Sequence, residues 1–149
     1  MPYSAEAVAN AFFDIAAANN KQLTNMQLQK LVFLAQGYSL ALLERCMFEN
    51  HIHAWQWGPV IPRLYKKLQQ FGSGTVTSRL EAVDSVAKDS EEYQIVEGVW
   101  GAYKDSSGAE LSALTHREGS PWSKAWAAKH FGKISIDDMK EYYLEIVAA

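Results

Sequence analysis

The chain has 149 residues, 48% of them hydrophobic and 21% charged, which predicts one domain over residues 1–149 with a substantial core. Its net charge of −3 argues against a nucleic-acid-binding protein, and its single Cys46 leaves no internal disulfide and no cysteine-based metal site. The sequence has no apolar run of about 20 residues and no basic segment typical of a signal peptide, so we expect a cytoplasmic protein without membrane contact.

The first predicted helix begins after Ser4, a residue typical of N-caps, and ends near Asn19 and Asn20. Apolar side chains at helical spacing support this helix: Val8, Ala11, Phe12, Ile15 and Ala16. Because only a short connection leads to the next helix, we expect the two to pack as antiparallel neighbours.

The stretch Thr24–Glu44 is predicted to be the central helix of the protein. Thr24 and Gln27 form a capping box, in which each side chain bonds a backbone N–H that the helix leaves free. Apolar residues then cover most of the circumference, a pattern typical of a buried helix. Gly37 costs about 1 kcal/mol inside a helix relative to Ala, so we expect a close backbone approach by a neighbouring segment there.

Two short strands, Cys46–Phe48 and Ile52–Trp55, are predicted around a turn at residues 49–51. A ribbon of two strands is marginal alone, so this prediction depends on packing against the helices.

A rigid aromatic turn is predicted next. Gly58 permits backbone angles that other residues resist, and Pro59 and Pro62 each fix φ and suit only the first turn of a helix. We therefore expect a helix that begins between Pro59 and Pro62 and ends at Gly72.

Residues 72–90 lose periodicity and are predicted to form a loop, the segment expected to be most mobile. The helices after it are expected to start at capping residues: Asp89 with Glu92, Ser107 with Glu110, Ser120 before Pro121, and Ser135 with Asp138. Gly119 and Gly132 are expected to end the helices that precede them. The predicted fold class is mainly α: a single compact domain of five to seven helices around a central buried helix, with at most a small β-hairpin.

Three ordered blocks of the sequence resemble a known family. They are Leu28–Phe33, Ile52–Tyr65 with its Trp-x-Trp-Gly-Pro-Val segment, and Leu114–Trp122. On these residues the chain resembles the Panacea domain family, the SocA-like family also known as phage-associated protein GepA. The resemblance implies an antitoxin beside a cognate toxin gene, or an adaptor that delivers a toxin to a protease. Since no helix-turn-helix is fused to the domain, we expect direct protein–protein neutralisation of a cognate toxin, with the adaptor role as an alternative.

The aromatic turn and the following helix are the candidate partner-binding surface, because a rigid aromatic turn offers contact area at little entropic cost. Its residues are Trp55, Trp57, Gly58, Pro59, Val60, Arg63 and Tyr65, and we expect one of the two tryptophans to be partly exposed. The other residues of the family blocks are expected to be structural: Leu28, Lys30, Leu31, Phe33, Thr115, His116, Pro121 and Trp122. The loop 72–90 and the C-terminal helix are rival surfaces for partner choice.

Catalysis, metal binding and nucleic-acid binding are the alternatives. A small phage-related enzyme would use His116 with Glu118, or His53 with a nearby carboxylate, yet the sequence has no Gly-x-Ser-x-Gly nucleophile motif. His51 and His53 could bind a metal from an extended segment, yet no HExxH motif or acidic cluster accompanies them. The net negative charge disfavours a nucleic-acid module. We therefore expect a protein that is not an enzyme and has no cofactor or metal.

Overall fold

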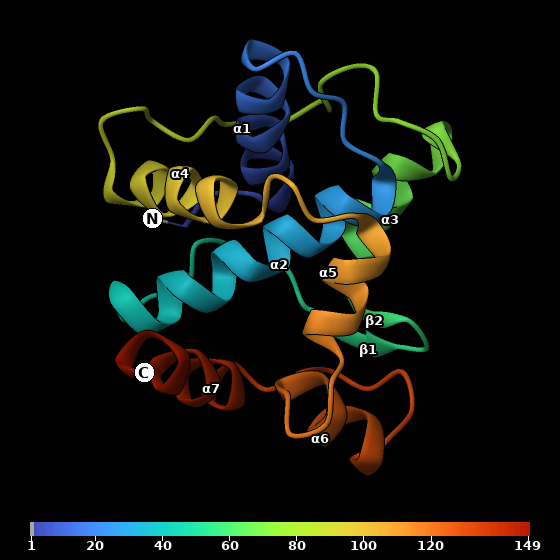
Figure 1. Ribbon diagram of the computed structural model, residues 1–149, viewed down its shortest axis with the longest axis vertical. Coiled ribbons are helices and arrows are strands. Elements are labelled where there is room, and N and C mark those ends of the chain that lie inside the picture. The colour runs from blue at the N-terminus through green and yellow to red at the C-terminus, as the bar shows by residue number, and fades with distance from the viewer. Residues whose placement is uncertain (1) are drawn as a thin grey trace.

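A computed structural model describes residues 2–149 of the chain. In chain order its elements are α1 (Ala5–Ala18), α2 (Asn25–Leu42), β1 (His53–Trp55), β2 (Gly58–Val60), α3 (Pro62–Leu68), the 3-10 helix η1 (Gln69–Phe71), α4 (Glu91–Tyr103), α5 (Gly108–Thr115), α6 (Pro121–Ala128) and α7 (Ile136–Ala148). The expected fold class is confirmed: helices dominate the described residues, and the strands form only a two-stranded antiparallel sheet (Figure 1). No helix within residues 2–149 has the length and apolarity needed to cross a membrane.

Helix α2 is the central element, and α1, α3, α4, α5 and α7 all pack against it (Figure 1). The predicted capping box is present, because Thr24 Oγ1 accepts from the Gln27 N–H at 3.1 Å and Gln27 Oε1 accepts from the Thr24 N–H at 2.8 Å. Between residues 28 and 41 the helix is buried almost throughout, which confirms the central buried helix. It ends at Leu42 rather than Glu44, because Glu44 adopts a left-handed φ of 58°.

Gly37 marks the close approach that was expected, with a different partner. A Cβ built on Gly37 would lie 2.5 Å from Cδ2 of Tyr143, well inside van der Waals contact. The approaching group is therefore an aromatic ring of α7 and not the backbone of a neighbour. Tyr143 is itself only 3% exposed and its ring packs edge-on against Phe33, so this contact joins α7 to the middle of α2.

Helix α1 has the predicted N-cap and a different orientation from the one expected. Ser4 Oγ accepts from the Ala7 N–H at 3.1 Å, and the helix ends at Ala18. Figure 1 shows α1 crossing α2 instead of running antiparallel to it. The link between them turns at Asn20, which has a φ of 56°, and then becomes extended, with the Leu23 carbonyl accepting from the Val76 N–H at 2.8 Å. This pairing with a distant loop replaces the tight helical hairpin that the short connection suggested.

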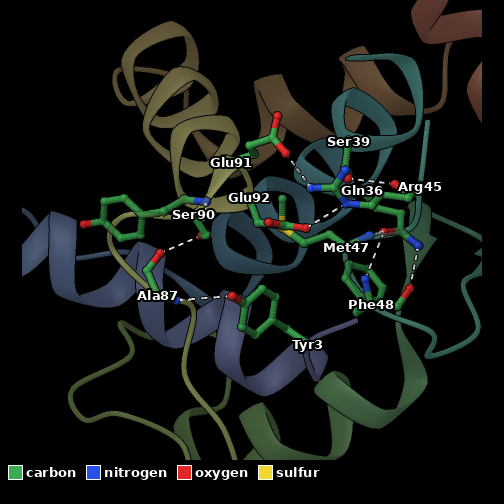
Figure 2. A network of polar contacts seen from close by, with 11 residues as sticks. Tyr3, Gln36, Ser39, Arg45, Met47, Phe48, Ala87, Ser90, Glu91 and Glu92 are labelled. Atoms are coloured by element: carbon green, nitrogen blue, oxygen red, sulfur yellow. Dashed lines mark hydrogen bonds and ion pairs between the residues drawn. The ribbon is translucent and has the colours of Figure 1, made fainter. Parts of the chain in front are cut away.

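The predicted strand Cys46–Phe48 is wrong, because a side chain takes the place of its strand partner. Gln36 Oε1 accepts from the N–H groups of Met47 at 2.7 Å and Phe48 at 3.2 Å, and its Nε2 donates to the Phe48 carbonyl at 2.8 Å (Figure 2). A buried amide offers a donor and an acceptor together, so Gln36 satisfies three backbone groups of this segment. The Met47 carbonyl accepts from the Tyr3 N–H at 2.8 Å, in an isolated parallel bridge between Tyr3 and Phe48. The hairpin forms further along the chain, between β1 and β2.

The second half of the chain departs from prediction mainly at helix ends. Ser90, not Asp89, caps α4 by accepting from the Tyr93 N–H at 3.1 Å. The expected caps of α5, α6 and α7 are confirmed. Helices α5 and α6 end at Thr115 and Ala128, before the glycines expected to end them, and Gly119 instead serves the turn to α6 with a φ of 83°. Residues 73–89 contain no helix or strand element, as predicted.

Candidate functional site

The hairpin formed by β1 and β2 carries the aromatic turn and lies beside α5 and α6 (Figure 1). Its register pairs His53 with Val60 and Trp55 with Gly58, so the connecting loop consists of Gln56 and Trp57 alone. Gly58 has a φ of +124°, a conformation that L residues rarely adopt, which explains why this tight loop needs glycine. The loop presents Trp57, whose exposure is 64%.

The other edge of β1 is also covered. The Ala54 N–H donates to the Gly132 carbonyl and the Ile134 N–H donates to the Ile52 carbonyl, both at 2.8 Å. Residues 132–134 thus lie along β1 like a third strand, so β1 is hydrogen-bonded on both sides. An exposed edge would invite pairing with another chain, and β1 has no such edge.

Every second carbonyl from residue 55 to residue 61 accepts a hydrogen bond from a helix side chain. The donors are Trp122 Nε1 to Trp55 at 2.6 Å, Ser112 Oγ to Trp57, Lys30 Nζ to Pro59 at 2.8 Å, and Gln29 Nε2 to Ile61 at 3.2 Å. They come from three helices: α2, and the consecutive helices α5 and α6 much later in the sequence. The backbone of the turn is therefore fixed at four successive points, while the ring of Trp57 extends away from them into solvent.

Lys30 is an unusual member of this set, because its charged end lies beneath the hairpin. The side chain is 3% exposed, and within residues 2–149 no carboxylate lies within 4.0 Å of its ammonium. Burial lowers the pKa of Lys30 to about 8. A Cβ added to Gly58 would lie 3.2 Å from Lys30 Nζ and 3.5 Å from Thr115 Oγ1, so the glycine also leaves room for this lysine.

The candidate partner-binding residues do not all face one surface. Trp57 is exposed, whereas Gly58, Pro59 and Val60 are buried in β2. Trp55 is half-buried and its ring packs edge-on against Tyr65, with centroids 5.0 Å apart.

Arg63 is exposed at the start of α3, where its Nε donates to Glu6 Oε2 at 3.3 Å, and so it belongs to the contact between α1 and α3. Of the proposed surface, Trp57 and Arg63 are therefore exposed, and the Trp55–Tyr65 pair is half-buried.

The residues expected to be structural lie in two places. Leu28, Leu31 and Phe33 are each 1% exposed and belong to the core around α2. Thr115, His116, Pro121 and Trp122 surround the junction of α5 and α6, next to the hairpin. Gln29 and Ser112, which complete the support of the turn, were missed. The sequence does not reveal which carbonyl a distant side chain reaches. The only available signal was position, because Gln29 lies in the first family block and Ser112 lies just before the third.

A row of stacked rings beside the hairpin was also missed. The ring of Trp126 stacks on Trp122 at 5.4 Å and on His130 at 3.9 Å, with interplanar angles of 13° and 11°. Phe131, which is 55% exposed, packs edge-on against Trp126. The spacing of four residues from Trp122 to Trp126 to His130 was the available signal, since such residues lie on one side of a helix. Basic residues surround this row in the sequence: Arg117, Lys124, Lys129 and Lys133.

The histidines have structural contacts. His116 caps α5, its Nδ1 is hydrogen-bonded to the Ser112 carbonyl, and its ring packs edge-on against Trp122 at 5.1 Å. His53 Nδ1 is 2.9 Å from the Phe131 carbonyl, and His51 is exposed. In the described part of the chain neither His116 nor His53 is hydrogen-bonded to a carboxylate, and no group of three potential metal ligands is found there.

The family follows from the sequence comparison. The profile of the family "Antitoxin SocA-like, Panacea domain" matches residues 28–123, which include most of α2, the hairpin and the start of α6. The chain belongs to this family. Antitoxin SocA of Caulobacter vibrioides (strain NA1000 / CB15N) is 31% identical over 127 residues, an alignment that covers 79% of this chain and 68% of that protein. No solved structure matches the chain. Membership in this family supports an antitoxin role, and with it a toxin partner in general.

The matched segment contains every side chain that fixes the turn. Gln29, Lys30, Ser112 and Trp122 all lie within residues 28–123, whereas α1 and α7 lie outside it. The family profile thus includes the hairpin and all four of these side chains.

Proposed function

We propose that the protein is an antitoxin that neutralises a cognate toxin by direct protein–protein binding, through a surface centred on Trp57 and flanked by Trp55 and Tyr65. The observation that carries this proposal is the 64% exposure of Trp57 at the tip of a hairpin whose backbone is held by four side-chain hydrogen bonds. The proposal places the protein in the cytoplasm with its toxin and assigns it no catalytic step.

An exposed tryptophan on fixed backbone suits a binding hot spot for two reasons. Binding would remove a large apolar area of its ring from water, and tryptophan is enriched among the residues that dominate binding energy at interfaces. Because the hairpin is already ordered, association does not have to order it again, so more of the contact energy appears as affinity. The supports described above thus serve the function by holding the tip in one conformation.

The experiment that tests this proposal uses the neighbouring gene. We expect its product to arrest growth when expressed alone and co-expression of this chain to restore growth. We expect Trp57→Ala to abolish rescue and Val83→Ala to retain it, because Val83 is a fully exposed apolar residue at 101% exposure in the loop after α3. Both variants should melt at the wild-type temperature. Full rescue by Trp57→Ala would contradict the surface assignment, and a harmless neighbouring gene would contradict the antitoxin role.

The same cells distinguish direct binding from the other two roles. Direct neutralisation leaves the toxin level unchanged during rescue, whereas an adaptor that delivers the toxin to a protease lowers it. A quantitative blot of the toxin therefore separates these mechanisms. For the enzymatic alternative, His116→Gln should still rescue growth, since we assign His116 a capping role on α5. Loss of rescue by a stably folded His116→Gln protein would favour catalysis.

A further inference from the structure

A pocket lies where the start of α1 meets α3 and the loop that follows α3. Its cavity volume is about 470 Å³, which is in the range of pockets that bind small molecules. The charged residues that line it are Glu6 from α1, Arg63 and Lys67 from α3, and Glu81 from the loop. A ligand in this pocket would therefore contact side chains of both charges.

The loop wall of the pocket is hydrogen-bonded to α1 and its N-cap on both sides of residues 81–83. On one side the Leu80 N–H donates to Asn10 Oδ1 at 2.7 Å, and Asn10 Nδ2 donates to the Leu80 carbonyl at 2.8 Å. On the other side the N–H and the Oγ of Ser4 donate to the carboxylate of Asp84 at 2.9 Å and 2.6 Å. These bonds hold residues 81–83 in place, so the pocket does not depend on a ligand to form.

The carboxylate of Glu6 lies at the wall of this pocket and has only one of its two oxygens hydrogen-bonded. The side chain is 5% exposed, and Oε2 accepts from Arg63 Nε at 3.3 Å. Oε1 is buried and has no hydrogen-bond partner within residues 2–149. Buried polar atoms are nearly always hydrogen-bonded, so a free carboxylate oxygen in the lining of a pocket favours a ligand that donates to it. An ammonium group is such a donor, and its charge matches that of the carboxylate.

The basic side chains of the lining favour a negative charge on the same ligand. Within residues 2–149 Arg63 forms hydrogen bonds only through its Nε, so its terminal NH2 groups remain available. In the same part of the chain neither Lys67 nor Glu81 has an opposite charge within 4.0 Å. A ligand with a single charge would meet like charges in this pocket, whereas a small zwitterion complements all four side chains.

We propose that this pocket binds a free α-amino acid. The ammonium of the ligand donates to Glu6 Oε1, and its carboxylate accepts from Arg63 and Lys67. The site goes beyond the proposed function, because its lining includes neither Trp57 nor the Trp55–Tyr65 pair. It stands or falls independently of the toxin.

Two variants remove one charge each, and each has a matched control. Glu6→Gln keeps the shape of the side chain and an acceptor for Arg63 but removes the negative charge. Glu145→Gln makes the same change at an exposed position on α7. Lys67→Met removes a basic group of the lining, while Lys66→Met changes its neighbour on α3, which is exposed and does not line the pocket. Lys67→Met also keeps the proposal testable if Glu6→Gln does not fold.

The probes are the standard L-amino acids, each added in turn to the full chain in a thermal-shift assay. We expect at least one to raise the melting temperature, since a ligand that binds only the folded state stabilises it. For the amino acid with the largest shift, calorimetry should give equal affinities for the wild type, Lys66→Met and Glu145→Gln. Glu6→Gln and Lys67→Met should bind it at least about tenfold more weakly, because each loses a charge-assisted hydrogen bond.

Two derivatives of that amino acid test the recognition of both charges. Its amide lacks the carboxylate and its N-acetyl form lacks the ammonium, so both should bind the wild type at least about tenfold more weakly than the free amino acid. Equal binding of either derivative would contradict the proposal. So would the absence of any thermal shift across the amino acids, or equal affinities within the pair Lys67→Met and Lys66→Met.

Discussion

Replacing Lys30 with methionine tests whether a charged amine supports the hairpin from beneath. In the structure the ammonium donates to the Pro59 carbonyl at 2.8 Å, and the side chain is 3% exposed. Burial disfavours the charged form, which lowers the pKa of Lys30 from its usual 10.5 to about 8. Methionine has similar length without charge, so Lys30→Met keeps most of the packing and removes the titrating group.

The direction of the pH dependence follows from the two states of the chain. In the unfolded chain Lys30 has its usual pKa, so between about pH 8 and about pH 10.5 the unfolded state binds more protons than the folded state. The contribution of Lys30 to stability therefore increases with pH across this range, and it is lowest below about pH 8, where the buried amine stays charged. At about 1.4 kcal/mol for each pKa unit, the increase between about pH 7.5 and about pH 10 is about 2 kcal/mol.

Urea denaturation of the wild type and Lys30→Met over this pH range measures the effect. The difference between their free energies of unfolding isolates Lys30, because the tyrosines that titrate at high pH are present in both proteins. Loss of the hydrogen bond to Pro59 shifts this difference by about 1–3 kcal/mol at every pH and does not alter its slope. Lys88→Met, at an exposed position, is the matched control for the loss of a lysine. A difference that stays constant for Lys30→Met as well would refute the buried charged amine.

Three further predictions concern packing and hydrogen bonds. Gly37→Ala should lower the free energy of unfolding by about 1–3 kcal/mol, because the added methyl group overlaps the ring of Tyr143. Gly98→Ala should raise the free energy of unfolding by up to about 1 kcal/mol, because alanine favours helix more than glycine does. Urea denaturation measures both, and equal effects of the two variants would contradict the packing at Gly37. Gln36→Leu should cost about 3 kcal/mol in the same assay, since it leaves three buried backbone groups at residues 47–48 without partners, and a neutral effect would show that water replaces the amide. Trp122→Phe keeps an aromatic ring but removes the N–H that donates to the Trp55 carbonyl in β1. The affinity for the proposed toxin should therefore fall by more than the lowered stability of the variant accounts for. Unchanged affinity in calorimetry would show that the hairpin does not need this hydrogen bond.

Local signals in the sequence predicted the helices well. The cap and capping-box patterns placed the starts of α1, α2, α5, α6 and α7 correctly. These patterns work because a cap is an interaction between residues three apart, which one short window of sequence contains. The continuous apolar surface of α2 likewise identified the central helix. Helix ends were predicted less well, because residues such as Glu44 adopted positive φ without being glycine.

The errors come from interactions between distant parts of the chain. The strand at Cys46–Phe48 does not form because Gln36 satisfies its backbone, and the sequence marks that glutamine only as one polar residue in an apolar helix. The burial of Lys30 and the hydrogen bond from Ser112 were not predicted for the same reason. Each side chain contacts the hairpin from a helix that is distant from it in the sequence. The aromatic turn itself was visible in the Trp-x-Trp-Gly-Pro-Val segment, and its exposed tip is Trp57.

The most direct test of the central claim is a calorimetric titration of the purified chain with the product of the neighbouring gene, the toxin of the proposed function. If the fixed hairpin presents Trp57 to that partner, Trp57→Ala should raise the dissociation constant at least about tenfold, a loss of about 1.4 kcal/mol in binding free energy. The melting temperature of the variant should be unchanged. An affinity equal to that of the wild type would contradict the claim that the tip of this hairpin is the binding surface.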